Sequence, residues 1–355
     1  MSIKLNDILN EFNLESEIDR YGNGHINDTY LTDSKKYILQ RINTNIFKNP
    51  EKLMDNIEKV TEFLREKIAA EGGDPSRETM RVIRTRHNKN HYKVDDDNVF
   101  RVYEFVRNTI TIETSKSYED LYNAGVGFGH FQKMLSDFPA EQLFETIPNF
   151  HYTPSRVDNL LKAIKEDKMG RAKSVQKEID FALEHAKEAS KVTDGIAKGD
   201  ILLRVTHNDT KINNILFDDK TGKAICVIDL DTVMPGSILY DFGDALRMGG
   251  STGAEDETDL SKVNFDNGAF EAFAKDFCSE TMDSMTEMEK ELLPFSVKLL
   301  TYECGIRFLT DYLEGDTYFK IHRPEHNLDR ARNQFKLVAD LDKKEDELLK
   351  IVKQL

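Results

Sequence analysis

The sequence predicts an α+β protein with two lobes, a small mixed β-sheet lobe followed by a larger, mainly helical lobe. Strand-like runs and one long helical pattern make up residues 1–106, whereas residues 107–355 are mainly helical apart from one strand-rich segment, 202–231. A chain of 355 residues also exceeds what one ordinary hydrophobic core holds. We therefore expect the crossover between the lobes near residues 103–111.

One long helix is predicted inside the small lobe. Asn49 is a suitable helix cap, and Pro50 suits the first helical position. Apolar residues then recur every three or four positions from Leu53 to Ile68, which is the spacing of one buried helix face. A glycine turn that leads into a strand is expected in residues 21–30, and further strands are expected at residues 36–42, 82–86, 91–94 and 99–106.

Composition and charge exclude several classes of protein. The formal net charge of -15 argues against a nucleic-acid partner, because phosphate backbones need a basic surface. No apolar run is long enough to cross a membrane, and the amino-terminal residues lack the pattern of a secretion signal. The three cysteines are scattered without the spacing of a zinc or redox site, so we expect reduced thiols and a cytoplasmic location.

The strand-rich segment contains a pattern typical of phosphoryl transfer. His207, Asp209 and Asn214 follow the spacing H-x-D-x-x-x-x-N, in which the aspartate accepts the proton of the acceptor hydroxyl and the asparagine binds Mg²⁺. Lys211 lies on the same loop, close enough in sequence to neutralise charge on the transferring phosphate. The pattern predicts an ATP- and Mg²⁺-dependent kinase with Asp209 and Lys211 as catalytic residues.

A predicted hairpin supplies the remaining metal ligands. Residues 215–217 and 224–228 are expected to pair through a short turn, which would bring Asn214 beside Asp229. Asp231, two residues further on, is a candidate second carboxylate ligand. Asp241 begins the triplet Asp-Phe-Gly that binds metal in protein kinases, but it lies far past Asn214. We expect Asp241 to cap a helix or to accept hydrogen bonds from the catalytic-loop backbone.

With these motifs, the chain resembles the aminoglycoside and choline kinase-like phosphotransferases, which share the protein kinase-like fold. Within them it resembles the N-acetylhexosamine 1-kinases, through the stretches YGNGHINDTY, RVTHNDTKINNILFD, VIDLDTVMPGS and TYECGIRFLTDYLEGDTYF. The resemblance covers essentially the full chain. It implies transfer of the ATP γ-phosphate to the anomeric hydroxyl of N-acetylglucosamine or N-acetylgalactosamine, with ATP bound by the amino-terminal lobe and catalysis and sugar binding in the carboxyl-terminal lobe.

The resemblance also implies binding residues for both substrates. The sugar pocket would be lined, together with Asp209, by the following residues: His25, Asn27, Arg307 and Tyr318. Adenine would lie against the crossover strand, at Tyr103, Glu104, Phe105 and Val106.

The sequence departs from the protein kinase pattern at one position. Gln40 stands where those enzymes keep the lysine that binds the α- and β-phosphates, so Glu58 need not form the usual ion pair with it. Either Gln40 or the neighbouring Arg41 is expected to contact phosphate, or the position is purely structural.

Three other functions are weighed against this one. A protein kinase would need a long activation segment, and only a short stretch separates Asp229 from Asp241, so no protein substrate is expected. A non-catalytic nucleotide-binding module would be expected to have lost one of the paired acids, and both are present. A kinase of choline, homoserine or an aminoglycoside remains the alternative to a sugar kinase.

Overall fold

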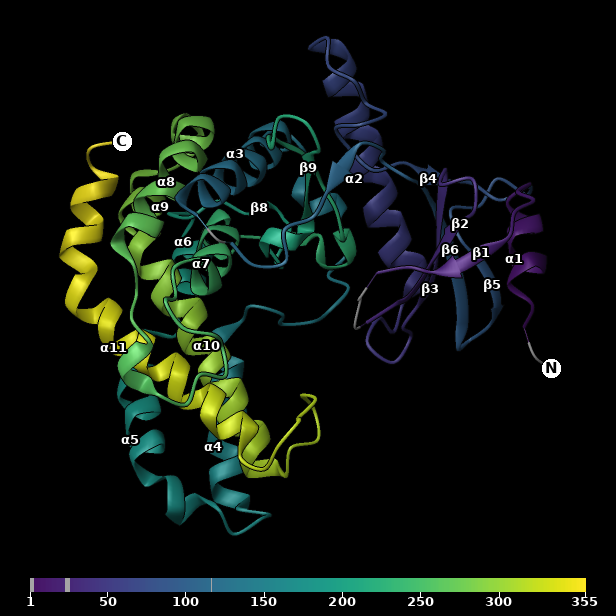
Figure 1. The fold of residues 1–355 in the computed structure, drawn as a ribbon. Helices are drawn as coiled ribbons and strands as arrows, with labels where there is room; N and C mark the ends of the chain where they lie inside the picture. The colour runs from purple at the N-terminus through teal and green to yellow at the C-terminus, as the bar shows by residue number, and fades with distance from the viewer. Residues whose placement is uncertain (1–2, 23–25, 116) are drawn as a thin grey trace. The chain divides into compact units, whose positions relative to one another are not determined.

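The computed structural model describes residues 3–22, 26–115 and 117–355, and the chain divides into two compact units. Unit 1 comprises residues 1–112, 134–148 and 213–235, and unit 2 comprises residues 113–133, 149–212 and 236–355. Unit 1 contains a small antiparallel sheet, and unit 2 is mainly helical (Figure 1). The predicted α+β fold, with a small sheet lobe and a larger helical lobe, is confirmed. The division into residues 1–106 and 107–355 stays a prediction.

The main sheet of unit 1 has six strands in the order β1-β2-β3-β6-β4, with β5 also paired to β6. All of these pairs are antiparallel. The strands are β1 (Ile18–Arg20), β2 (Asp28–Thr32), β3 (Tyr37–Ile42), β4 (Val82–Ile83), β5 (Tyr92–Asp95) and β6 (Asn98–Glu104). Helix α1 (Leu5–Glu11) packs its apolar residues against β3 and β6, which closes one hydrophobic core of the unit (Figure 1).

Helix α2 (Pro50–Ala70) forms where its cap and apolar spacing predict it. The Asn49 side chain accepts a hydrogen bond from the backbone N–H of Lys52, which satisfies one of the donors left open at a helix start. The apolar face from Leu53 to Ile68 is buried. Unit 1 also holds a second, three-stranded sheet in the order β10-β9-β7, made of β7 (Thr109–Ile110), β9 (Ile215–Asp218) and β10 (Ala224–Val227).

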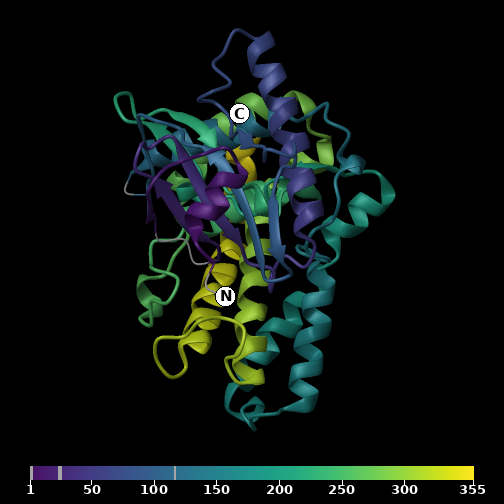
Figure 2. The same ribbon diagram turned by 90° about the vertical axis from the view of Figure 1, so that its right-hand side faces the viewer.

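Unit 2 is organised around helix α10 (Leu293–Glu314), which lies beside helices α4, α7 and α11. Figure 2 shows α10 and α11 side by side, as Figure 1 does. Residues of α10 are buried on nearly all sides, as expected for a helix that is apolar around most of its circumference. The helices are α3 (Tyr118–Met134), α4 (Thr153–Glu166), α5 (Gln176–His185), α6 (Lys191–Lys198), α7 (Ile238–Gly249), α8 (Asn267–Thr281), α9 (Glu287–Glu291), α10 and α11 (His326–Val352).

Strand β8 (Arg204–Thr206) precedes the catalytic-loop sequence, and β11 (Met234–Gly236) precedes α7. Cys226, Cys278 and Cys304 are free thiols, as predicted. Among the described residues, none of the helices is both long and apolar enough to span a bilayer.

Candidate active site

The predicted hairpin between β9 and β10 exists and fixes the backbone around Asn214 and Asp229. The two strands are antiparallel, and Val227 lies opposite Ile215 at their end. The next residue, Ile228, donates its backbone N–H to the Asn214 carbonyl oxygen over 2.9 Å. Asn214 and Asp229 therefore flank the same end of one hairpin within unit 1.

The other end of this hairpin is closed by Asp218. Its carboxylate accepts hydrogen bonds from the backbone of Lys220 and Thr221 and from the Thr221 hydroxyl, which builds a tight turn. The backbone N–H of Thr221 and the Arg77 guanidinium lower the pKa of Asp218 to about 2, because both favour the ionised carboxylate. Gly222 follows with a positive φ of 68°, a conformation that glycine adopts without steric cost.

Asp229 adopts an unusual backbone conformation. Its φ of 59° and ψ of 57° lie in the left-handed region, immediately before the short helical turn η5 (Leu230–Thr232). This conformation is sterically unfavourable for residues other than glycine, and among those residues aspartate and asparagine tolerate it best. Such positions persist where surrounding contacts hold them, and they cluster at functional sites.

Asp231, in the same turn, is held by a buried ion pair. The Arg101 Nη1 and Nη2 atoms donate to its two carboxylate oxygens over 2.5 and 3.0 Å, and the Asn27 amide donates over 2.6 Å. Burial alone would lower the pKa of Arg101, but the charge of Asp231 outweighs it and raises that pKa, so the guanidinium stays charged. The Asn27 amide oxygen in turn accepts the backbone N–H of Asn43. These contacts leave the metal role predicted for Asp231 and the sugar role predicted for Asn27 untested.

Gln40 faces the same network from β3. Its amide oxygen accepts the Nε proton of Arg101 over 2.9 Å, and its amide nitrogen donates to the Thr29 hydroxyl over 3.0 Å. Arg41 points to the other face of the strand and pairs with Asp28. The sequence alone could have drawn attention to Arg101, because it is a charged residue in the middle of the otherwise apolar run Val99–Tyr103.

The predicted adenine segment continues directly from β6. Tyr103 is buried, and this burial raises the pKa of its hydroxyl. The backbone N–H of Phe105 donates to the Lys36 carbonyl oxygen, and the Phe105 ring meets the Tyr21 ring edge to face at 6.0 Å. Glu104 pairs with Arg81 at 3.3 Å, and Val106 is buried. The segment is thus anchored to the strand before it.

In unit 2, Asp209 and Lys211 form an ion pair on the loop after β8. The Lys211 Nζ lies 2.7 Å from an Asp209 carboxylate oxygen, and the Asp209 side chain keeps 24% of its surface exposed. Burial alone would raise the pKa of Asp209, but Lys211, with His207 and Arg247, holds that pKa below its usual value. Asp209 is therefore ionised at neutral pH and still reachable from solvent.

Asp241 orders this loop from within helix α7. Its carboxylate accepts the backbone N–H groups of His207 and Asn208 over 2.9 and 2.8 Å and the Gln132 amide over 2.6 Å. The prediction that Asp241 accepts hydrogen bonds from the loop backbone is confirmed. Asn208, held in this way, has a positive φ of 64°.

A second buried pair supports the same loop. The His151 ring lies 2.9 Å from a Glu303 carboxylate oxygen and 3.1 Å from the Asn208 carbonyl oxygen, so a protonated ring can donate to both. Burial alone would lower the pKa of His151, but the Glu303 charge outweighs it and raises that pKa. The Thr153 hydroxyl also donates to Glu303. His151 is therefore a buried histidine whose two ring nitrogens both have hydrogen-bond partners.

His151 should make stability depend on pH. Because its folded pKa is raised above the unfolded value of about 6.5, its stabilisation is complete below that pH and is lost as pH rises through the folded pKa. We expect the free energy of unfolding of the His151→Gln variant to fall less than that of the wild type between pH 6 and 9. Denaturant titrations measure this, with His130→Gln, at an exposed histidine, as the control. Equal pH dependence in all three proteins would contradict the assignment.

Arg307 and Tyr318 lie together in unit 2. The Arg307 guanidinium lies 6.0 Å from the centre of the Tyr318 ring and 5.4 Å from that of Phe319. Tyr318 is 73% exposed, yet its loop is fixed, because the buried Asp311 carboxylate accepts the consecutive backbone N–H groups of residues 317–319 over 2.8 to 2.9 Å. The predicted sugar residue His25 lies outside the described residues.

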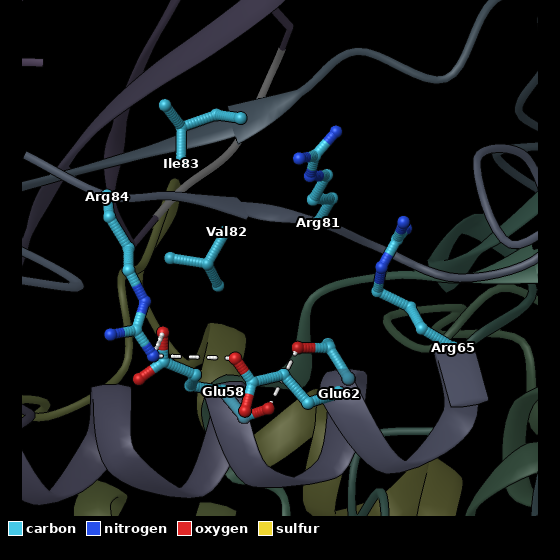
Figure 3. A pocket seen from close by; sticks show the side chains of 8 residues that line it. Glu58, Glu62, Arg65, Arg81, Val82, Ile83 and Arg84 are labelled. Carbon is cyan, nitrogen blue, oxygen red and sulfur yellow. Dashed lines mark hydrogen bonds and ion pairs between the residues drawn. The ribbon is translucent and has the colours of Figure 1, made fainter. Parts of the chain in front are cut away.

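A cavity of about 410 Å³ lies elsewhere in unit 1, between α2 and the segment around β4. Figure 3 shows Arg65, Arg81 and Arg84 around it, with Arg84 paired to Glu58 at 2.9 Å. None of the predicted site residues that the structure describes lines this cavity. Within residues 3–22, 26–115 and 117–355, no three His, Cys, Asp or Glu side chains gather as a ready-made metal site.

Several solved structures share the fold of this chain, and a family profile matches its sequence. An aminoglycoside phosphotransferase from Alicyclobacillus acidocaldarius has a TM-score of 0.63 at 13% identity, covering 100% of this chain and 96% of that chain. A spectinomycin phosphotransferase in complex with ADP and spectinomycin has a TM-score of 0.59 at 13% identity, covering 99% and 98%. An amicoumacin kinase in complex with AMP-PNP and Ca²⁺ has a TM-score of 0.54 at 12% identity, covering 93% and 88%. The profile of the phosphotransferase enzyme family matches residues 17–275. Since that match spans well over half of the 355 residues, the chain belongs to the phosphotransferase enzyme family.

Proposed function

We propose that the protein transfers the γ-phosphate of ATP to the anomeric hydroxyl of an N-acetylhexosamine, N-acetylglucosamine or N-acetylgalactosamine. The observation that carries the phosphoryl-transfer part is Asp209, an ionised and partly exposed carboxylate on a loop whose backbone is fixed by Asp241. Membership of the phosphotransferase enzyme family supports the same reaction class. The choice of sugar rests on the sequence resemblance of the stretches around the loop and α10.

In this proposal Asp209 orients the acceptor hydroxyl and accepts its proton. A carboxylate with a lowered pKa is a weak base, but the loose transition state of phosphoryl transfer needs alignment more than basicity. Lys211 keeps Asp209 ionised and carries the positive charge that the transferring phosphate requires.

Asn214 and Asp229 would hold a magnesium ion. Both supply oxygen ligands, which Mg²⁺ prefers, and they flank one end of the β9–β10 hairpin. Magnesium commonly takes only one or two carboxylates and completes its shell with phosphate oxygens and water, so a cluster of three acids is not required. When bound, the ion neutralises charge on the β- and γ-phosphates.

The binding roles follow the same resemblance. ATP would place its adenine against residues 103–106, and Gln40 would lie on the phosphate side of the nucleotide. Arg307 and the exposed Tyr318 are proposed to contact the sugar, with His25 and Asn27. Two of the solved structures that resemble the chain contain ADP or AMP-PNP, which supports a nucleotide donor here.

A substrate panel tests this function directly. The purified protein would be incubated with ATP, Mg²⁺ and, separately, N-acetylglucosamine, N-acetylgalactosamine, glucose, choline, homoserine and kanamycin. We expect sugar-dependent ADP release with the two N-acetylhexosamines and a phosphorus NMR signal coupled to the anomeric proton. Transfer only to choline, homoserine or kanamycin would overturn the sugar assignment, and no transfer to any acceptor would count against a kinase of this class.

Removing Lys211 should shift the pH profile of the reaction. Without its charge, burial dominates at Asp209 and raises the pKa of that carboxyl, so the Lys211→Met variant should lose kcat/KM at a higher pH on the acid side than the wild type. Profiles of kcat/KM between pH 4 and 9 measure the shift. Lys220→Met, an exposed change in the hairpin turn, serves as control. An unchanged acid limb in Lys211→Met would contradict the pairing.

A further inference from the structure

The face of strand β3 that carries Gln40 has no cation, because Arg41 lies on the other face and pairs with Asp28. Gln40 occupies the position where protein kinases keep a lysine, and the whole chain carries a net charge of -15. The neighbouring strand β6 supplies a positive charge, on Arg101. Gln40 lies directly opposite Arg101 across the β3–β6 pair, and side chains opposite each other in an antiparallel pair start only about 5 Å apart.

Arg101 uses all three of its guanidinium nitrogens in this region. Its Nε donates to Gln40, and its two terminal nitrogens form a bidentate pair with Asp231. The side chain is 1% exposed, so the pair is shielded from solvent and from salt. A buried ion pair of this kind contributes little to net stability, but it fixes geometry strongly because neither partner can leave without stranding the other.

The side chains of helix α2 make other contacts than those of the corresponding helix in a protein kinase. Its Glu58 pairs with Arg84 and accepts a hydrogen bond from Asn90 instead of meeting a β3 lysine. The contact from α2 to the metal-ligand turn comes from Asn56, whose buried amide donates to the Val233 carbonyl oxygen over 3.1 Å. Asn56 and Arg101 thus hold the turn from two elements.

We propose that Arg101 is a positioning residue for phosphoryl transfer. Its ion pair with Asp231 takes the place of the ion pair that a lysine of β3 and a glutamate of the following helix form in protein kinases. Arg101 acts by holding the Asp231 carboxylate, and with it the left-handed backbone of Asp229, two residues earlier. Asp231 is then a bridge between the sheet and the metal ligand and does not itself bind metal. This inference rests on the proposed function, because it assigns Asp229 to the metal.

A charge-swap experiment tests the proposal. Arg101→Gln removes the cation, and the double variant Gln40→Lys with Arg101→Gln returns a cation from the opposite position of the strand pair. A second double variant, Arg101→Gln with Asp231→Asn, removes both charges and therefore leaves no unpaired buried ion. It serves as the reference if Arg101→Gln alone does not fold. Arg84→Gln is the matched control, an arginine of the same unit whose ion pairs lie at the cavity in Figure 3.

Calorimetry would measure ATP binding in Mg²⁺ and, separately, in EDTA. We expect Arg101→Gln to weaken binding of Mg·ATP by roughly 10- to 100-fold, the usual cost of losing a partner outside the metal shell. Binding of metal-free ATP should change by less than about threefold, since Arg101 is not itself assigned to adenine and residues 103–106 keep their side chains. The charge swap should recover most of the Mg²⁺-dependent affinity, the neutral pair should not, and Arg84→Gln should match the wild type.

Two results would overturn the proposal. One is equal loss of affinity in Mg²⁺ and EDTA for Arg101→Gln, which indicates a general structural effect. The other is a charge swap that binds Mg·ATP no better than Arg101→Gln or, should that variant not fold, no better than the neutral pair. Failure of the proposed function is distinguishable, because the wild type itself would then show no Mg²⁺-dependent ATP binding.

Discussion

Asp209→Asn is expected to lower turnover by several orders of magnitude, roughly 10⁴-fold, while ATP binding stays close to that of the wild type. The amide cannot accept the hydroxyl proton, and it loses the negative charge that orients the acceptor and pairs with Lys211. Adenine and metal contacts are assigned to other residues, so the affinity for Mg·ATP should hold. Steady-state kinetics with the best acceptor from the panel, together with calorimetry, measure the two quantities separately.

Asp219→Asn is the matched control for this experiment. It removes the same charge from an exposed residue of the hairpin turn, and turnover should be unchanged. Turnover by Asp209→Asn within tenfold of the wild type would refute the catalytic role of Asp209. Loss of ATP binding along with turnover would instead indicate that the loop has changed shape.

Asp229→Ala is expected to abolish most Mg²⁺-dependent nucleotide binding. Loss of the carboxylate removes a direct ligand, so the cost should exceed the roughly 10- to 100-fold that follows from loss of an outer partner. The difference between the ATP affinities measured in Mg²⁺ and in EDTA gives the contribution of the metal ion to binding. Asp229→Asn is a useful second variant, because asparagine also tolerates the left-handed backbone at this position.

Asp241→Ala should give the opposite result. It removes the acceptor of three buried hydrogen bonds and strands their donors, which should destabilise the protein by about 3 kcal/mol or more. Magnesium-dependent ATP binding should survive at temperatures where the variant is folded. If Asp241→Ala lost metal-dependent binding while Asp229→Ala only lost stability, the assignment of the two aspartates would be reversed.

Local patterns in the sequence were sufficient to predict helix α2 and the β9–β10 hairpin. The cap at Asn49 and the apolar spacing after it predicted α2, since both depend on residues within a few turns of each other. The β9–β10 hairpin was predictable for the same reason, because a short turn fixes which residues pair. The supporting role of Asp241 followed from its distance in sequence from Asn214 and from the lack of a predicted strand directly before it.

Long-range polar contacts were not predictable in this way. Asp231 meets Arg101, which is 130 residues earlier, and Asn27, which is 204 residues earlier. The local sequence contains no sign of such a pairing, so it predicted Asp231 only as a candidate second metal ligand after the hairpin. The support given by His151 to the catalytic loop is of the same kind, since it depends on Glu303 across the helical unit. Each compact unit is likewise assembled from three separate segments, which depends on long-range contacts that local sequence patterns do not contain.

The loop that carries Tyr318 is ordered before any ligand arrives. Three consecutive backbone N–H groups already donate to the Asp311 carboxylate. Binding of a molecule to the Tyr318 ring would therefore cost little conformational entropy of the loop backbone. The contact free energy of the aromatic face is then not reduced by a cost of ordering the loop backbone. An acceptor that contacts this face would meet a preorganised surface and would need no closing movement of the loop itself.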